Sequence, residues 1–235
     1  MCPPCPGLKN CLMPSESLQR LDFFEKIAPY YDFLIDLLTL GTYARFLKKA
    51  VEVLAPEPGE RILDLCSGTG RVASWISQRV GENGEVVGMD VAKCMVKISK
   101  SRYRNLKSLT FLKQDVTELW ADDPLFNGIF ISFSLHELPE KDWRGVLEQS
   151  YLALTEGGRM VIADFNSQLS GWRRNLLQIF FRIFESTNLS FLSFEQGRIL
   201  NEVGFKRIQN FPVLSSLFQI TLARKSDCFT PSRCK

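Results

Sequence analysis

The segment that decides the fold of this chain is residues 62–70, which read Ile-Leu-Asp-Leu-Cys-Ser-Gly-Thr-Gly. The apolar residues at its start predict a short strand, and the glycines predict a tight turn into a helix. Gly68 and Gly70 let the backbone approach a ligand closely because they carry no Cβ atom. The helix that follows directs its first N–H groups toward the same place. This arrangement predicts a ligand site at the carboxyl end of the strand.

Strand and helix patterns alternate along most of the chain. The expected strands lie at residues 61–66, 85–90, 109–112, 128–133, 160–165, 205–211 and 218–224. Helices between the earlier strands predict right-handed βαβ units and a parallel sheet. We expect Gly157 and Gly158 to turn the chain into the fifth strand, and Pro212 to turn the final hairpin. The predicted fold class is α/β, a Rossmann-like three-layer sandwich with a mostly parallel seven-stranded sheet and a reversed C-terminal strand.

The same patterns predict how the chain is divided. The expected segments are a flexible Cys/Pro tail at 1–17, an N-terminal helical cap at 18–56, a Rossmann-like domain at 57–225 and a C-terminal tail at 226–235. Within the cap, apolar residues at three- and four-residue steps predict a helix over 43–54 that Thr42 can cap.

Composition excludes several classes of protein. Apolar residues make up 45% and charged residues 23%, which is ordinary for a soluble globular chain, and the net charge of +3 is too small to indicate nucleic-acid binding. We find no secretory signal and no apolar run of the roughly 20 residues that span a bilayer. Seven cysteines argue against a disulfide framework, and the Cys2-x-x-Cys5 pair alone does not predict a metal site. We therefore expect a cytoplasmic protein without a metal.

Acidic residues follow the first strands of the predicted sheet. Asp90 ends the second strand, where a carboxylate can accept both ribose hydroxyls of an adenosine. Asp64 ends the first strand, where a buried acid suits an ammonium group and repels a pyrophosphate. Asp115 and Val116 follow the third strand and can contact the adenine. Each acid also has a structural alternative: Asp64 could cap the glycine turn, Asp90 could be the N-cap of the next helix, and Asp115 could simply start a loop. Gly68, Gly70 and Ala73 also satisfy the dinucleotide fingerprint of NAD-binding proteins.

The region 61–165 resembles class I S-adenosylmethionine-dependent methyltransferases, and within them the ubiquinone/menaquinone C-methyltransferase family. The resemblance is carried by Val-Gly-Glu-Asn-Gly-Glu-Val-Val at 80–87, Ile-Ser-Phe-Ser-Leu at 131–135, Gly-Gly-Arg at 157–159 and Tyr31-Asp32. It implies S-adenosyl-L-methionine as the cofactor. Together with the acids above, it implies cofactor contacts at Tyr31, Asp64, Gly68, Thr69, Gly70, Asp90, Val91, Asp115, Val116 and Ser132.

The chain departs from this family in the motifs that surround the methyl acceptor. His136-Glu137 stands where the family has Arg-Asn, residues 164–166 read Asp-Phe-Asn in place of Glu-x-Ser, and Phe33-Leu34 replaces Met-Asn. We expect in-line methyl transfer to a small lipophilic, quinone-precursor-like acceptor. A phospholipid, a thiol or a small amine is the alternative acceptor, and an NAD-dependent oxidoreductase or a non-catalytic adenosine-binding module is the alternative class.

His136, the chain's one histidine, follows the fourth strand at the edge of the sheet where α/β proteins bind ligands. It could act as a general base, since its ordinary pKa lies near neutral. The alternative is a solvated loop residue or a packing histidine. Methyl transfer needs a base only when the acceptor must lose a proton, so an enzyme of this type could lack one.

An aromatic insertion follows the fifth strand. Its large side chains include Trp172, Phe180, Phe181, Phe184, Phe191 and Phe194. One interpretation is a helix that packs on the sheet. The other is a lid over a greasy acceptor, which would also touch a membrane surface through residues 172–192.

Overall fold

The computed structural model describes residues 30–118, 125–184 and 189–226 of the chain. The expected Cys/Pro tail and almost all of the expected C-terminal tail lie outside these ranges, as does the start of the expected helical cap. The domain boundaries therefore stay predictions.

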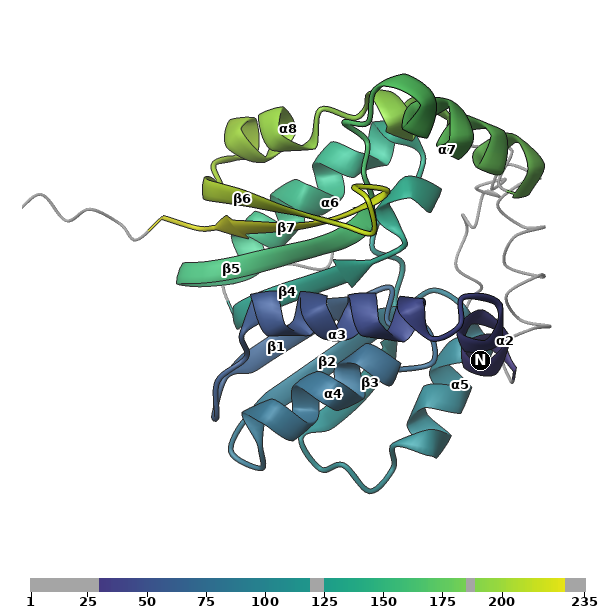
Figure 1. Cartoon of the computed structure of the whole chain (residues 1–235). Coiled ribbons are helices and arrows are strands. Elements are labelled where there is room, and N and C mark those ends of the chain that lie inside the picture. The colour runs from purple at the N-terminus through teal and green to yellow at the C-terminus, as the bar shows by residue number, and fades with distance from the viewer. Residues whose placement is uncertain (1–29, 119–124, 185–188, 227–235) are drawn as a thin grey trace, which may run out of the picture.

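One sheet organises the molecule. Its strands are β1 (Arg61–Leu65), β2 (Glu85–Asp90), β3 (Leu109–Lys113), β4 (Phe126–Ser132), β5 (Leu154–Phe165), β6 (Lys206–Val213) and β7 (Phe218–Arg224). The strand order is β3-β2-β1-β4-β5-β7-β6, and β7 runs antiparallel to both of its neighbours (Figure 1). The predicted seven-stranded sheet with a reversed C-terminal strand is confirmed.

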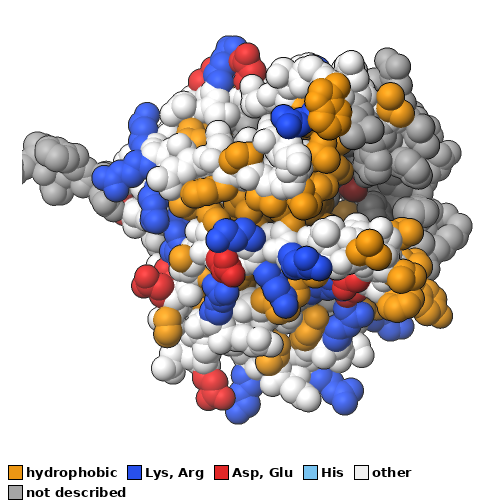
Figure 2. Space-filling view, viewed as in Figure 1, with side chains coloured by type: hydrophobic (Ala, Val, Ile, Leu, Met, Phe, Trp, Pro, Cys, Tyr) orange, Lys and Arg blue, Asp and Glu red, His pale blue; other side chains and the backbone are white. Residues whose placement is uncertain are grey.

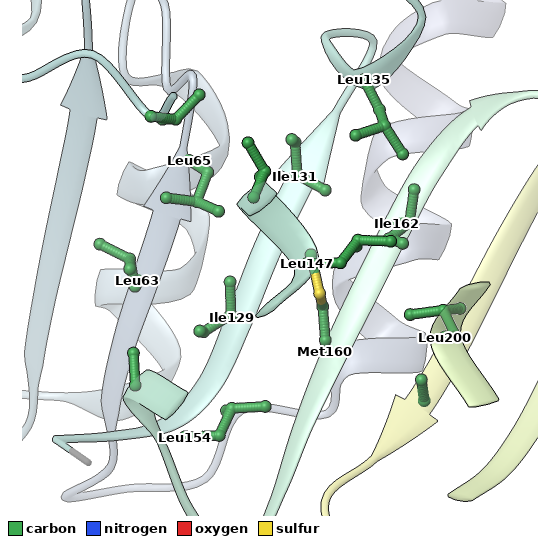
Figure 3. Packing of buried hydrophobic residues seen from close by; sticks show 14 of the residues in the cluster. Leu63, Leu65, Ile129, Ile131, Leu135, Leu147, Leu154, Met160, Ile162 and Leu200 are labelled. Carbon is green, nitrogen blue, oxygen red and sulfur yellow. The ribbon is translucent and has the colours of Figure 1, made fainter. Parts of the chain in front are cut away.

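Helices cover both faces of this sheet. They are α2 (Tyr31–Leu38), α3 (Thr42–Leu54), α4 (Arg71–Val80), α5 (Lys93–Arg102), α6 (Glu140–Ala153), α7 (Gly171–Phe184) and α8 (Gln196–Val203), with short 3-10 helices η1 (Leu135–Glu137) and η2 (Leu189–Ser193). Alternate residues of each strand face opposite sides. Ile62 of β1 packs with α3 and α4, whereas Leu63 packs with α6 and α8. Figure 3 shows the core on the side of α6 and α8, a cluster that includes Leu147 and Leu200 from the helices and Ile129 and Met160 from the strands.

Three local predictions are wrong. Thr42 does not cap α3, because the capping residue is Gly41 in the left-handed conformation. Gly157 and Gly158 do not precede the fifth strand but lie inside β5, which starts at Leu154. Pro212 lies inside β6, and the hairpin turn follows it at residues 214–217. An edge strand tolerates proline because one side of it needs no N–H donor, and β6 is an edge strand.

A largely buried ion pair holds the loop that precedes β1. The Arg159 guanidinium of β5 lies 2.6 Å from the Glu60 carboxylate, and it donates to the carbonyls of Leu54 and Ala55 at the end of α3. Burial opposes ionisation of Glu60, but the hydrogen bonds from Arg159 outweigh it and lower the pKa of that carboxyl. The loop before β1 is therefore held to the rest of the sheet.

Candidate active site

The glycine turn lies where β1 ends and α4 begins. Gly68 and Gly70 both have positive φ, at 52° and 79°. A Cβ atom on Gly70 would lie 2.4 Å from the Phe111 ring, whereas a Cβ atom on Gly68 would meet nothing within 4 Å. Gly70 is thus required for packing against β3, and Gly68 is the glycine that leaves open space beside the backbone. The sequence had predicted close ligand approach for both.

Asp90 holds the turn together from the neighbouring strand. Its carboxylate accepts the Gly68 N–H at 2.7 Å and the Ala92 N–H at 2.8 Å. Burial raises the pKa of this carboxyl, and the two backbone hydrogen bonds act in the opposite direction. Asp90 thus holds the loop before α5 but is not the N-cap of that helix, which is Ala92. These backbone contacts are compatible with a ribose contact because each carboxylate oxygen has a second lone pair.

Asp64 is a buried acid next to the same turn. Its side chain is almost fully enclosed, and its Oδ2 atom has no hydrogen-bond partner among the described residues. Burial raises the pKa of Asp64 to about 8; a backbone hydrogen bond from Ala73 lowers it and the charge of Asp90 raises it. A buried carboxylate oxygen without a donor fits a cationic ligand group, such as the ammonium of an amino-acid moiety. The residues present thus fit the cofactor implied by the sequence.

The N-terminal helix closes on the turn through a residue that the sequence reading did not assign. Asp32 of α2 accepts a hydrogen bond from the Thr69 hydroxyl at 2.9 Å and lies 3.3 Å from Arg71 Nε. It also pairs with Arg102 of α5, while Asp36 lies 2.8 Å from Arg71. The side chain of Tyr31, a predicted cofactor contact, lies outside the described part of the structure. The Tyr-Asp element was the signal for this contact, but it gave no partner for Asp32.

The remaining predicted cofactor contacts lie along the same edge. Asp115 Oδ1 accepts the backbone N–H and the hydroxyl of Thr117, so this acid shapes its own loop after β3. Val116 is buried in the core beside the ends of β1 and β2, while Val91 is 37% exposed. Ser132 ends β4. Strands β3, β2, β1 and β4 are neighbours in the sheet, so these residues share one carboxyl edge with Asp64 and Asp90.

His136 is a buried residue of η1. Its Nδ1 atom lies 2.6 Å from Asp164 Oδ1, and the two side chains are 3% and 4% exposed. The solvated-loop interpretation of this histidine is thus wrong. Three phenylalanine rings surround the imidazole, with ring centroids at 4.9 Å for Phe165, 5.9 Å for Phe191 and 6.5 Å for Phe133. The sequence identified Asp164 as part of a departure from the family's motif, but nothing in the sequence indicated that it contacts His136.

Aromatic rings extend from this histidine toward the N-terminal helices. Phe133 lies 5.0 Å from Tyr43 of α3 and 5.6 Å from both Phe165 and Phe218, measured between ring centroids. Phe133, Phe165 and Phe218 are only partly buried. This cluster gives the carboxyl edge an apolar, aromatic surface next to the glycine turn.

Part of the aromatic insertion after β5 packs in the core and part is exposed, so each of the two interpretations made from the sequence, a packing helix and a lid, finds some agreement. Phe191 and Phe194 pack on Trp143 of α6 and belong to the core. Trp172, at the start of α7, is 68% exposed. The side chains of residues 180–184 lie outside the described part.

Within the described ranges, no group of His, Cys, Asp and Glu side chains could hold a metal ion.

Comparison with known proteins identifies the family of this chain. Residues 13–193 match the ubiE/COQ5 methyltransferase family. The 2-phytyl-1,4-naphtoquinone methyltransferase of Thermosynechococcus vestitus is 29% identical over 222 residues, which cover 86% of this chain and 97% of the relative. The ubiquinone/menaquinone biosynthesis C-methyltransferase UbiE of Photorhabdus laumondii is 31% identical over 166 residues, 69% of this chain and 65% of that protein.

Solved structures support the fold. A SAM-dependent methyltransferase from Aquifex aeolicus superposes with a TM-score of 0.59 at 21% identity, over 76% of this chain and 88% of its own. A putative methyltransferase of Haloferax volcanii, solved with its Trm112 activator, reaches 0.66 at 14% identity, over 86% and 97% of the two chains. The chain belongs to the ubiE/COQ5 methyltransferase family and is an S-adenosyl-L-methionine-dependent methyltransferase.

Proposed function

We propose that this methyltransferase methylates a ring carbon of a lipophilic quinol. The observation that carries the proposal is the partly exposed aromatic cluster around Phe133, at the edge of the sheet that also carries the glycine turn. Flat aromatic rings stack on such a surface, whereas a polar metabolite would call for charged or amide side chains there. The names of the relatives agree, since one acts on a phytyl naphthoquinone. The family leaves no place for the NAD-dependent alternative.

The proposed cofactor contacts follow from the acids at the carboxyl edge. Asp64 faces the ammonium group, Asp90 the ribose hydroxyls, and Asp115 with Val116 the adenine. Gly68 and Thr69 lie beside the amino-acid portion, Gly70 supports their turn, and Tyr31, Val91 and Ser132 complete the pocket. When bound, the cofactor supplies an electrophilic methyl group on a sulfonium. The chain's own contribution is to align the acceptor with that methyl group, since in-line displacement depends mainly on proximity and orientation.

We also propose that the protein is cytoplasmic and touches a membrane surface at the end of the molecule where the acceptor enters. Along the described ranges, no helix has the length and apolar character to cross a membrane. Large apolar side chains are nevertheless exposed on α2 and its flanks, at Tyr30, Phe33, Leu34, Leu37, Leu38 and Leu40. Figure 2 shows hydrophobic side chains gathered there, and Figure 1 places α7, with the exposed Trp172 and Ile179, at the same end. An exposed apolar helix face of this kind suits the headgroup region of a bilayer.

The experiment that tests the proposed acceptor is label transfer from methyl-labelled S-adenosylmethionine. The acceptors are the reduced form of a phytyl naphthoquinone, a phospholipid mixture, a thiol and a small amine. Label on the naphthoquinol ring supports the proposal. Label only on the phospholipid, thiol or amine would replace it with the corresponding alternative.

A further inference from the structure

A histidine and an aspartate meet at the carboxyl ends of β4 and β5. Besides the 2.6 Å contact with His136 Nδ1, the Asp164 carboxylate accepts the backbone N–H of Phe165 at 2.7 Å and that of His136 at 3.3 Å. The carboxylate therefore touches the side chain and the backbone of the same histidine. This fixes both the position of η1 and the orientation of its imidazole ring.

The hydrogen bonds also indicate which imidazole nitrogen carries the proton. Each oxygen of Asp164 already accepts a backbone N–H, so we take His136 Nδ1 as the donor in the contact between the side chains. A neutral imidazole has one N–H, so Nε2 is then its basic nitrogen. A carboxylate in this position also stabilises the protonated imidazolium.

The surroundings of the imidazole suit a ring acceptor. Asp164 approaches from β5, Glu137 is the acidic neighbour within η1, and the rings of Phe133, Phe165 and Phe191 cover other sides. Phe133 and Phe165 contact the imidazole and are themselves partly exposed, whereas His136 is buried. Access of an acceptor ring stacked on this pair to the imidazole requires one of the two phenylalanine rings to turn aside.

We propose that Asp164 is a positioning residue that holds His136 as the general base for the acceptor hydroxyl. The inference rests on the proposed function, since only a hydroxylated acceptor has a proton to give. It adds the identity of the base and of the group that orients it, at positions where the chain departs from the family's motifs.

The proposed step balances as follows. His136 Nε2 takes the proton of the acceptor O–H, and the oxygen electron pair raises the electron density of the ring. The ring carbon forms a bond to the methyl carbon while the bond from methyl to sulfur breaks, and the sulfur keeps that electron pair. The methylated ring then loses the hydrogen of that carbon as a proton to water, and the oxygen recovers a proton from the imidazolium. One proton is released in total, and no oxidant or reductant is used.

The first test reads the imidazole directly. His136 is the chain's one histidine, so tag-free full-length protein labelled with ¹⁵N-histidine gives a single set of ring signals. We expect a protonated Nδ1 and an unprotonated Nε2 at high pH. Asp164→Asn removes the charge that favours the imidazolium, so the imidazole pKa should fall by about one to three units. A neutral imidazole protonated on Nε2, or the same pKa in the variant, would overturn the proposal.

The second test is the pH profile of kcat/KM, with the naphthoquinol as acceptor. The base acts when deprotonated, so its pKa sets the acid limb, and in Asp164→Asn this limb should move to lower pH by the shift seen in the spectra. His136→Gln can still donate an amide N–H to Asp164 but cannot take a proton, so kcat should fall by roughly 10²–10⁴-fold. Its affinity for S-adenosylhomocysteine and its Tm should stay close to wild type.

The control is Glu148→Gln, which removes a carboxylate from the exposed face of α6 and should change neither profile nor rate. Two failures can be told apart. If the wild type labels no hydroxylated ring, both the proposed function and this inference fall. If the wild type labels the naphthoquinol but the acid limb of Asp164→Asn coincides with that of the wild type, only this inference falls, and the pair merely pins η1 to β5.

Discussion

Both carboxylate oxygens of Asp32 lie 2.9 Å from the hydroxyl of Thr69, so the N-terminal helix α2 is hydrogen-bonded to the glycine turn. Arg71 and Arg102 complete this contact on the side of α4 and α5. Among the described residues, α2 also packs against the neighbouring helix α3. The position of α2 over the turn therefore depends on these polar side chains and on that packing.

The first prediction concerns the contacts of Asp32 with Thr69, Arg71 and Arg102, which we call the α2 clamp. Asp32→Asn keeps the size of the side chain but removes the charge that holds two guanidinium groups. Hydrogen bonds to charged groups contribute about 1.5–3 kcal/mol each, so amide exchange in α2 should speed up by at least about tenfold. Hydrogen-exchange mass spectrometry on peptides that cover residues 31–38 measures this.

A matched control for the clamp is Glu52→Gln, which breaks an exposed ion pair with Lys49 on α3. Exposed pairs of this kind contribute about 0–1 kcal/mol, so exchange in α2 should not change. Equal exchange rates in Asp32→Asn and the wild type would show that α2 is held by its apolar contacts with α3 alone.

The second prediction concerns Asp64. Its folded-state pKa of about 8 lies above the ordinary value of 3.8, so the folded protein without cofactor keeps a proton there that the unfolded chain releases. The stability of the cofactor-free protein should therefore fall as pH rises from 4 to 8, by up to about 1.4 kcal/mol per unit from this group. Asp64→Asn should flatten that slope, which urea unfolding at several pH values measures.

The same carboxyl should report on the ligand. If an ammonium group binds at Asp64, the carboxyl ionises and S-adenosylhomocysteine binding at pH 7 releases a proton. Calorimetry in phosphate and in Tris buffers, which differ in ionisation enthalpy, measures that proton. Identical apparent enthalpies in the two buffers would place the ammonium away from Asp64.

Much of the fold was predictable because the strands are buried runs with clear ends. The segments predicted at 85–90 and 218–224 coincide with β2 and β7. Pro212 misled the prediction because proline also marks turns, and the sequence alone does not show that β6 is an edge strand. Gly157 misled it because its positive φ is accommodated inside β5.

The site was predictable where residues follow directly after strands, and not where partners are far apart. Asp64 and Asp90 were predicted to lie at the carboxyl edge because each stands at the end of a predicted parallel strand, and all parallel strands end at that edge. Asp32 and Arg102 are 70 positions apart, and His136 and Asp164 are 28 apart. Only the placement of α2 beside the glycine turn and α5, and the pairing of β4 with β5, bring these residues together.

The third prediction concerns Asp90, which holds two backbone N–H groups and faces the proposed ribose site. Asp90→Ala should lower the affinity for S-adenosylhomocysteine at least about tenfold, through loss of charge-assisted bonds worth roughly 1.5–3 kcal/mol. It should also lower Tm, because the N–H groups of Gly68 and Ala92 lose their acceptor. Asp90→Asn keeps one acceptor oxygen, so its affinity and its Tm should lie between those of Asp90→Ala and the wild type. An unchanged dissociation constant together with a lowered Tm would leave Asp90 a structural role only.

The fourth prediction concerns the apolar face of α2. Phe33 and Leu37 are 67% and 59% exposed, while Asp32 and Asp36 on the same helix are bound to arginines. Because both acids are paired with arginines beside the glycine turn, the exposed side of α2 is dominated by apolar side chains. Insertion of such a face into the headgroup region depends on the apolar area that it buries, at roughly 25 cal/mol per Å². Replacing both residues with serine should weaken binding to phosphatidylglycerol-containing vesicles at least about tenfold.

The matched control is Leu152→Ser, which removes a side chain of similar exposure, 56%, from α6 on the other face of the sheet. Vesicle sedimentation of the full-length protein measures binding, and affinity for S-adenosylhomocysteine shows whether the site is intact. With the α2 double variant, methylation of a phytyl naphthoquinol held in vesicles should slow, while methylation of a short-chain naphthoquinol in solution should keep its rate. That difference separates membrane capture from chemistry. If all three proteins sediment alike, the exposed face of α2 does not dock on membranes, and the acceptor reaches the aromatic cluster from solution.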